Sequence, residues 1–353
     1  MKKLLFFLLV VSFFSCQEET PKTNFEHLIE DELIEVDDNP KVTLPSYEFP
    51  KVRNVDSVNN TVFQATLESD LSKNKNNVYA ASLLMAWDEI ENQLKGELTD
   101  FESKELEKMY RSTSHQNVLL RNEYKTSVEW IGGIIKAKAE FKKTLPFSSP
   151  FTKHREKLKF GKDKVSSFGF KGERYNAEIM YYKNDNDFCL AITPREKIHQ
   201  IYLMKSPQYK ITFKENFDEI LKKRKKQFAN QKNTWKQHLQ HDDIAKIPMI
   251  EFNLENNYEK MVNSYFFNTK RDTFQVLKAW QRTAFILNEK GAIIESEAEM
   301  VVDAVTEAAE TKETPPTPKK LIFDKKFMIF LKRRDAKNPY FALQITDAEL
   351  LIK

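Results

Sequence analysis

The sequence predicts an α+β domain, and three observations support that prediction. Thr283–Leu287 is a short, nearly continuous apolar run, which is typical of a strand covered on both faces. Leu321–Leu331 contains two further strand-like runs, LIF and FMIFL. The segment 197–246 instead carries an amphipathic helical stripe. Strands and helices in separate stretches of the chain fit the α+β class.

Composition limits the function classes. The chain has 353 residues, 41% of them hydrophobic, which is ample for one large domain or two small ones. Its net charge of +4 is too small to imply a nucleic-acid partner. The seven glycines form neither GxGxxG nor GxxxxGK[ST], so a nucleotide-binding glycine loop is not expected. We expect no cofactor and no nucleic acid.

The N-terminus has the pattern of an export signal. Lys2-Lys3 precede an apolar run from residue 4 to 14, which is too short to span a bilayer as a stable helix. Ser15-Cys16 follows, and a cysteine at this place resembles the lipobox of bacterial lipoproteins. That resemblance implies that Cys16 becomes the acylated N-terminus and holds the protein at a membrane. Plain cleavage and an unprocessed anchor are the alternatives.

The N-terminal pattern also sets the expected domain boundaries and location. Residues 1–15 are the signal peptide, 16–56 an acidic tether that contains several prolines, and 57–353 the folded domain. Gln17–Glu19 resembles the surface-export tag of Bacteroidota lipoproteins. We therefore expect an exported protein, lipid-anchored to the outer membrane at the cell surface, with the periplasmic face as the alternative.

The elements expected within the domain follow in chain order. Residues 57–96 look helical in two pieces, and the second ends near Gly96. Residues 177–194 form a hairpin with a turn at Asn184–Asn186. Cys189 is the sole cysteine after Cys16, so we expect an inert core thiol and no internal disulfide. The stripe of the later helix consists of Phe217, Leu221, Phe228, Trp235 and Leu239.

A long connection separates the apolar strand at 283–287 from the next one. Glu289-Lys290-Gly291 ends the strand, and residues 291–318 carry no obvious core. A compact domain rarely keeps such a loop without a function for it. From residue 292 to 304 one parity is apolar or small and the other mostly acidic, as in a strand with one buried face. The same segment also fits an amphipathic helix, through Ile294, Ala298 and Val301.

A family resemblance rests on these and other segments. QRTAFILNEKG (281–291), the long loop and LIFDKKFMIFLKRRDAKNPYFALQIT (321–346) resemble the C-terminal quarter of a serpin. EFKKTLPFSSPF (140–151) and IPMIEFNLENNYEKMV (247–262) follow the family order, so that the resemblance covers residues 57–353. It implies a large mixed or antiparallel main sheet, a smaller sheet, flanking helices and an exposed reactive-type loop at about 291–318.

The sequence also departs from the serpin pattern. The two serines of the family's shutter region fall at Ala81 and Leu84, and Leu145 or Phe147 stands where the family has a tryptophan. The segment 97–140 is short, and at least one family helix is missing from it. These departures put the usual opening of the main sheet in doubt.

The resemblance implies a protease inhibitor that acts through its exposed loop. The target is expected to be a serine-type protease, or else a cysteine-type one, and the inhibitor a monomer. The hinge would consist of Glu289, Lys290, Gly291, Ala292 and Ile294. The scissile region would lie at Val305-Thr306 for elastase-like or subtilisin-like enzymes and at Lys312 for trypsin-like ones. The alternative is a non-inhibitory surface lipoprotein that serves as a binding module.

Two further clusters of side chains are candidate binding sites. One is a basic helical face that is either a solvated surface or a polyanion site, formed by Lys222, Lys223, Arg224, Lys225 and Lys226. The other, formed by His238, His241, Asp242 and Asp243, fits no standard zinc spacing, so no metal is expected. No nucleophile–base grouping or carboxylate pair stands out, so we expect no enzyme.

Overall fold

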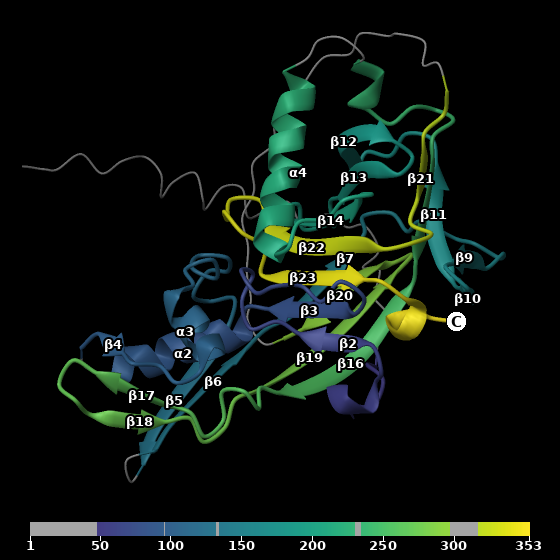
Figure 1. The fold of residues 1–353 in the computed structure, drawn as a ribbon. Coiled ribbons are helices and arrows are strands. Elements are labelled where there is room, and N and C mark those ends of the chain that lie inside the picture. The colour runs from purple at the N-terminus through teal and green to yellow at the C-terminus, as the bar shows by residue number, and fades with distance from the viewer. Residues whose placement is uncertain (1–47, 95, 132–133, 230–233, 297–316) are drawn as a thin grey trace, which may run out of the picture. The chain divides into compact units, whose positions relative to one another are not determined.

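The structure is a computed structural model that describes residues 48–94, 96–131, 134–229, 234–296 and 317–353 (Figure 1). These described residues belong to one compact unit. Cys16, Val305, Thr306 and Lys312 lie outside the described residues. The domain begins earlier than residue 57, because β1 (Arg53–Asn54) already pairs in parallel with β16 (Ile250–Asn257). The tether expected at 16–56 is therefore too long at its C-terminal end.

A seven-stranded sheet forms one half of the core in the described part of the chain. Its order is β12-β13-β14-β22-β23-β3-β2. The bounds are β2 (Thr61–Phe63), β3 (Asn76–Ala80), β12 (Ala177–Asn184), β13 (Asp187–Ile192), β14 (His199–Lys205), β22 (Phe327–Arg333) and β23 (Phe341–Ile345). Every residue of β14, β22 and β23 is buried, which explains their continuous apolar runs.

A five-stranded sheet forms the other half, in the order β1-β16-β19-β20-β7. Its remaining bounds are β7 (Lys142–Pro146), β19 (Trp280–Asn288) and β20 (Gly291–Glu295). Within the described residues, the pairs β16–β19, β19–β20 and β20–β7 are antiparallel, and only the edge strand β1 runs parallel to its neighbour β16. The run at 283–287 is thus a central strand, as its composition predicts.

Smaller sheets contain the other described strands. A four-stranded sheet has the order β21-β15-β11-β8, with β8 (Thr152–Lys153), β11 (Ser167–Lys171), β15 (Ile244–Pro248) and β21 (Lys320–Ile322). The other pairings join β9 (Leu158–Phe160) to β10 (Asp163–Val165), β5 (Lys125–Ile131) to β6 (Ile134–Glu140), and β17 (Tyr265–Asn268) to both β4 (Leu98–Thr99) and β18 (Thr273–Gln275).

Helices are few among the described residues, and local sequence signals set their ends. The bounds are α2 (Ser82–Gln93), α3 (Lys104–Arg111) and α4 (Phe213–Phe228), with short 3-10 turns at Val55–Ser57, Thr234–Lys236 and Ala348–Leu350. Thr212 and Glu215 form a capping box that starts α4, and the Ser103 hydroxyl accepts a hydrogen bond at the start of α3.

Aromatic contacts join the two large sheets and α4. The Phe285 ring of β19 lies 4.8 Å from the Phe341 ring of β23. On the other face of the seven-stranded sheet, the ring centroid of Phe217 of α4 lies 5.4 Å from those of both Phe330 and Tyr202. Full burial of such side chains stabilises the fold by about 1.5–3 kcal/mol each. The core thus continues from the five-stranded sheet through the seven-stranded sheet to α4.

The structure confirms a mixed fold with several sheets and few helices, and it corrects some elements. Asn76–Ala80 is a buried strand, where a helix was predicted through this segment. The later helix ends at Phe228, and its Leu221 is 39% exposed, so the predicted stripe is only partly a core face. The hairpin around Asn184–Asn186 is confirmed by the β12–β13 pairing, and Cys189 is a buried free thiol.

Candidate functional site: the two ends of segment 297–316

The candidate site consists of two described stretches, 289–296 and 317–319, that flank segment 297–316. The first stretch is not an exposed loop. Gly291–Glu295 form β20, an inner strand of the five-stranded sheet that is hydrogen-bonded between β19 and the edge strand β7 (Figure 1). The loop expected to begin at residue 291 therefore does not begin before 296, and the helical alternative is wrong for 292–295.

A tight turn holds the start of β20. The Phe147 and Phe151 amides donate hydrogen bonds to the Lys290 and Glu289 carbonyls at 2.9 and 2.8 Å. At Gly291 a Cβ would lie 2.5 Å from the Leu145 carbonyl oxygen, closer than real Cβ atoms come to another atom. Only glycine therefore fits this position without movement of the β7 backbone.

The residues of β20 alternate between the core and the outer face of the sheet. Ala292 and Ile294 are fully buried and Ser296 is 2% exposed, which matches the apolar-or-small parity of the sequence. Glu295 points the other way and pairs with Lys142 and Arg282, each at 3.0 Å. Although partial burial acts to raise it, these two cations hold the pKa of Glu295 below its ordinary value. The carboxylate thus ties β20 to both neighbouring strands.

A buried hydrogen-bond network lies where β20 ends. The Ser82 and Ser296 hydroxyls are 2.8 Å apart, and the Gln281 amide donates to the Ser82 Oγ at 2.8 Å and to the Ala80 carbonyl at 2.9 Å. The Tyr258 hydroxyl donates to the other end of Gln281. Sequence reasoning missed Ser82, because the family pattern placed its serines at Ala81 and Leu84. The network joins the start of α2 to Ser296, the residue that follows β20.

The C-terminal end of the segment is fixed by a buried lysine. The Lys319 Nζ lies 2.7 Å from Asp243 Oδ2 and donates to the His238 carbonyl at 3.0 Å. The Lys319 amide donates to the other Asp243 oxygen at 2.6 Å. Trp235 and Tyr182 place their ring centroids 5.3 and 5.9 Å from the ammonium. Burial lowers the pKa of Lys319, and Asp243 opposes that shift. This anchor holds the chain at the entry to β21.

A second buried charge cluster lies beside β7. Glu123 is fully buried and contacts Lys143 at 3.2 Å and Arg333 at 2.8 Å. Its pKa is raised by burial, which the hydrogen bonds from the Leu120 amide and Arg333 oppose. Burial and the two nearby cations lower the pKa of His199 to about 3, so this imidazole is neutral. Lys143 faces Ile294 in the strand register, so the cluster sits directly beside β20.

Some of the other residues predicted to bind a ligand are instead paired with neighbouring side chains. Lys223 pairs with Asp187 at 2.9 Å and Arg224 with Glu178 at 3.2 Å, whereas Lys222, Lys225 and Lys226 are exposed. Asp243 is used by Lys319. The described residues contain no group of three or more His, Cys, Asp or Glu side chains placed to hold a metal. None of their helices is long and apolar enough to cross a membrane.

Comparisons with known proteins give distant structural likenesses. No family model matches the chain, and no curated protein matches it. Among solved structures, the chain is similar to Serpin48, a highly specific serpin of the insect Tenebrio molitor, with 15% sequence identity and a TM-score of 0.32. The alignment covers 58% of this chain and 53% of the insect serpin, so it spans about half the length of that protein.

Proposed function

We propose that the protein is a protease inhibitor that offers segment 297–316 to a serine-type protease as bait. The observation that carries the proposal is the position of β20 between β19 and β7. The segment follows an inner strand of one sheet and leads to the edge strand of another, β21, and Lys319 is fixed just before that strand. Both ends are held while the segment between them connects two sheets. Such a connection suits a substrate-like loop presented by a rigid scaffold.

The pairing of β19 leaves a place for a longer β20. Gly291–Glu295 pair with β19 only from Asn288 back to Ala284. On that side, Trp280–Thr283 pair with no other described strand, although β16 pairs with them on the opposite side. After cleavage, Ser296 would face Thr283, and the residues beyond Ser296 would continue the ladder along Arg282 and Gln281. The sequence alternation continues through residue 304, so the same parity would face the core.

A specific observation favours a second function, that of a binding module without the switch. The Ser82–Ser296–Gln281 network is closed and buried at the place where β20 would have to lengthen. If extension displaces Ser296, the two hydroxyls separate, and an unsatisfied buried hydroxyl costs about 1–3 kcal/mol. If this network stays intact after cleavage, β20 does not lengthen, and the protease cleaves the segment and dissociates without forming a stable adduct.

Incubation with trypsin-like, elastase-like and subtilisin-like proteases distinguishes the two functions. An inhibitor gives an adduct that survives SDS, and its cleavage raises the melting temperature as β20 lengthens. A matched pair of variants tests the mechanism: Ala298→Arg places a charge on the parity expected to face the core, and Glu299→Arg on the opposite parity. We expect the first to abolish the adduct and the second to keep it. Clean proteolysis of the parent protein without adduct or stabilisation supports the binding module.

We also propose that Cys16 carries a lipid that anchors the domain to the outer membrane at the cell surface. The support is the sequence pattern of residues 1–16. Cells fed a labelled fatty acid should incorporate it into the parent protein and not into Cys16→Ser. Equal labelling of both, or of neither, would contradict the anchor.

A further inference from the structure

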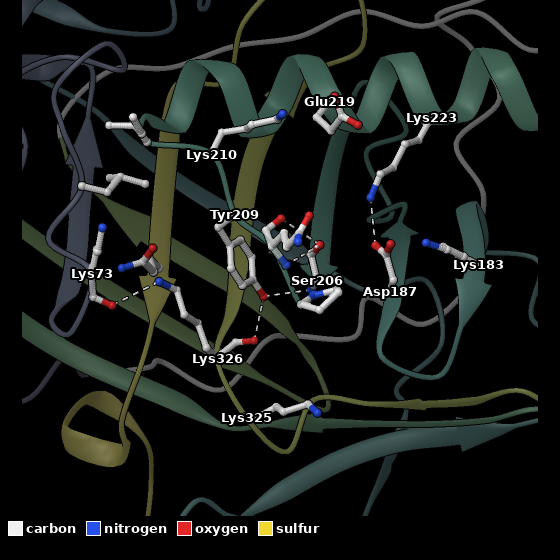
Figure 2. Close-up of a pocket in the computed structure, with 15 residues that line it drawn as sticks. Lys73, Lys183, Asp187, Ser206, Tyr209, Lys210, Glu219, Lys223, Lys325 and Lys326 are labelled. Atoms are coloured by element: carbon white, nitrogen blue, oxygen red, sulfur yellow. Dashed lines mark hydrogen bonds and ion pairs between the residues drawn. The ribbon is translucent and has the colours of Figure 1, made fainter.

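A large pocket beside α4 has no role in the proposed inhibition. Its volume is about 1030 Å³, which is at the upper end of the range for small-molecule sites. It lies between α4, the segment 206–211 that leads into that helix, and the turn before β22 (Figure 2). The remaining wall comes from the β12–β13 hairpin and from residues 71–73.

Positive charge dominates the lining. Six lysines line the pocket: Lys73, Lys183, Lys210, Lys223, Lys325 and Lys326. Only two carboxylates accompany them, Asp187 and Glu219, which leaves an excess of four positive charges. No arginine contributes. Figure 2 shows that these ammonium groups come from all sides of the pocket rather than from one helical face.

Most of these lysines have no acidic partner. Lys223 is neutralised by Asp187 at 2.9 Å. In the described part of the chain, the other five lining lysines form no ion pair with a carboxylate. Lys326 has no carboxylate to offset its burial. Its Nζ donates instead to the Lys73 carbonyl at 3.2 Å, and burial lowers the pKa of this ammonium group. The other four, Lys73, Lys183, Lys210 and Lys325, are exposed, and positive charges gathered around one hollow attract an anion.

The backbone that presents the lysines is fixed before any ligand arrives. The Tyr209 hydroxyl donates to the Lys326 carbonyl at 2.7 Å and accepts from the Ser206 amide at 3.0 Å. Asn216 of α4 bonds both the amide and the carbonyl of Lys210. Gln344 donates to the carbonyls on either side of residues 73 and 74. The backbone beneath the lysines therefore needs no reordering on binding, and only the lysine side chains lose conformational freedom.

We propose that this pocket binds a compact polyanion that carries several phosphate or sulfate groups. Lysine ammonium groups act as point charges that suit tetrahedral oxyanions, whereas planar carboxylates favour the arginine fork. The volume exceeds what one inorganic ion needs, and the lysines on opposite walls require negative groups spaced around one molecule. The site differs from the exposed α4 face, because only Lys223 belongs to both, and it does not depend on the proposed inhibition.

Calorimetric titration of the intact protein tests the proposal with three probes: inositol hexakisphosphate, a fully sulfated oligosaccharide, and myo-inositol as the uncharged control. The pocket variant is Lys73→Gln/Lys325→Gln/Lys326→Gln. The matched control, Lys222→Gln/Lys225→Gln/Lys226→Gln, removes the same charge from the exposed helical face. Circular dichroism confirms that both variants are folded.

We expect at least one polyanion to bind and myo-inositol not to bind. The pocket variant should bind at least about tenfold more weakly, because it lacks three of the ammonium groups that line the pocket, while the control should change little. A preference between the two polyanions identifies the phosphate or the sulfate class. The proposal is overturned if no polyanion binds, or if the helical-face variant loses as much affinity as the pocket variant.

Discussion

Replacement of Lys319 by methionine tests whether the buried ion pair anchors the entry to β21. Removal of one partner of a buried pair costs about 3–5 kcal/mol, because the other charge is left behind. Asp243 would still accept two backbone hydrogen bonds, from the Lys319 amide at 2.6 Å and the Gln240 amide at 2.9 Å. The loss for Lys319→Met should therefore be near the lower limit, about 3 kcal/mol.

The double variant Lys319→Met/Asp243→Asn separates charge from packing. It removes both charges and keeps side chains of similar volume, so it should be more stable than the sum of the two single losses predicts. Urea unfolding followed by tryptophan fluorescence measures each free energy of unfolding, and Trp235 lies against the ammonium. The exposed neighbour Lys320→Met is the control and should change stability by less than about 0.5 kcal/mol. A loss below about 1 kcal/mol for Lys319→Met, or strict additivity in the double variant, would refute the anchor.

Three further predictions concern buried charge and backbone geometry. Glu123→Gln removes the carboxylate that Lys143 and Arg333 share, and it should destabilise the fold by about 3–5 kcal/mol in chemical denaturation. The control Glu129→Gln, at an exposed position of the β5–β6 hairpin, should change stability little in the same measurement. Burial lowers the pKa of Lys332 to about 8, so the folded chain loses this proton at a lower pH than the unfolded chain does. The stability of the parent protein relative to Lys332→Met should therefore rise by about 1–2 kcal/mol from pH 8 to about pH 10. A fall in relative stability over this range would contradict the prediction. Gly291→Ala places a Cβ against the Leu145 carbonyl oxygen. The variant should lose about 1–3 kcal/mol of stability, or β20 should be displaced, which would appear as faster amide exchange in β20. An unchanged melting temperature and exchange rate would show that the strand tolerates a side chain.

The sequence predicts the strands and hairpins whose signals are local. The continuous apolar run at 283–287 and the turn at Asn184–Asn186 both led to elements that the structure contains. Asn76–Ala80 was missed, because its apolar residues continue without a break into α2 and fit a helix equally well. In such a run, long-range pairing decides the conformation, and here β23 supplies it.

The site depends on contacts between residues far apart in the chain. Residues 292–295 fit a strand and a helix alike, and their conformation is decided by two neighbouring strands that offer hydrogen bonds. No spacing rule connects Ser82 with Ser296 or Asp243 with Lys319. The pocket lysines likewise come from separate segments, so their convergence is a property of the fold rather than of any motif.

The place of the last strands in the sheet order has a consequence for a nicked molecule. β22 lies between β14 and β23, and β23 between β22 and β3, so the piece that follows segment 297–316 forms the middle of a sheet built by the piece that precedes it. A chain cut in that segment should therefore elute as one particle under native conditions and separate into two polypeptides in denaturant. Its reassembly would be bimolecular, with a rate that depends on protein concentration, whereas the intact chain refolds at a rate independent of it.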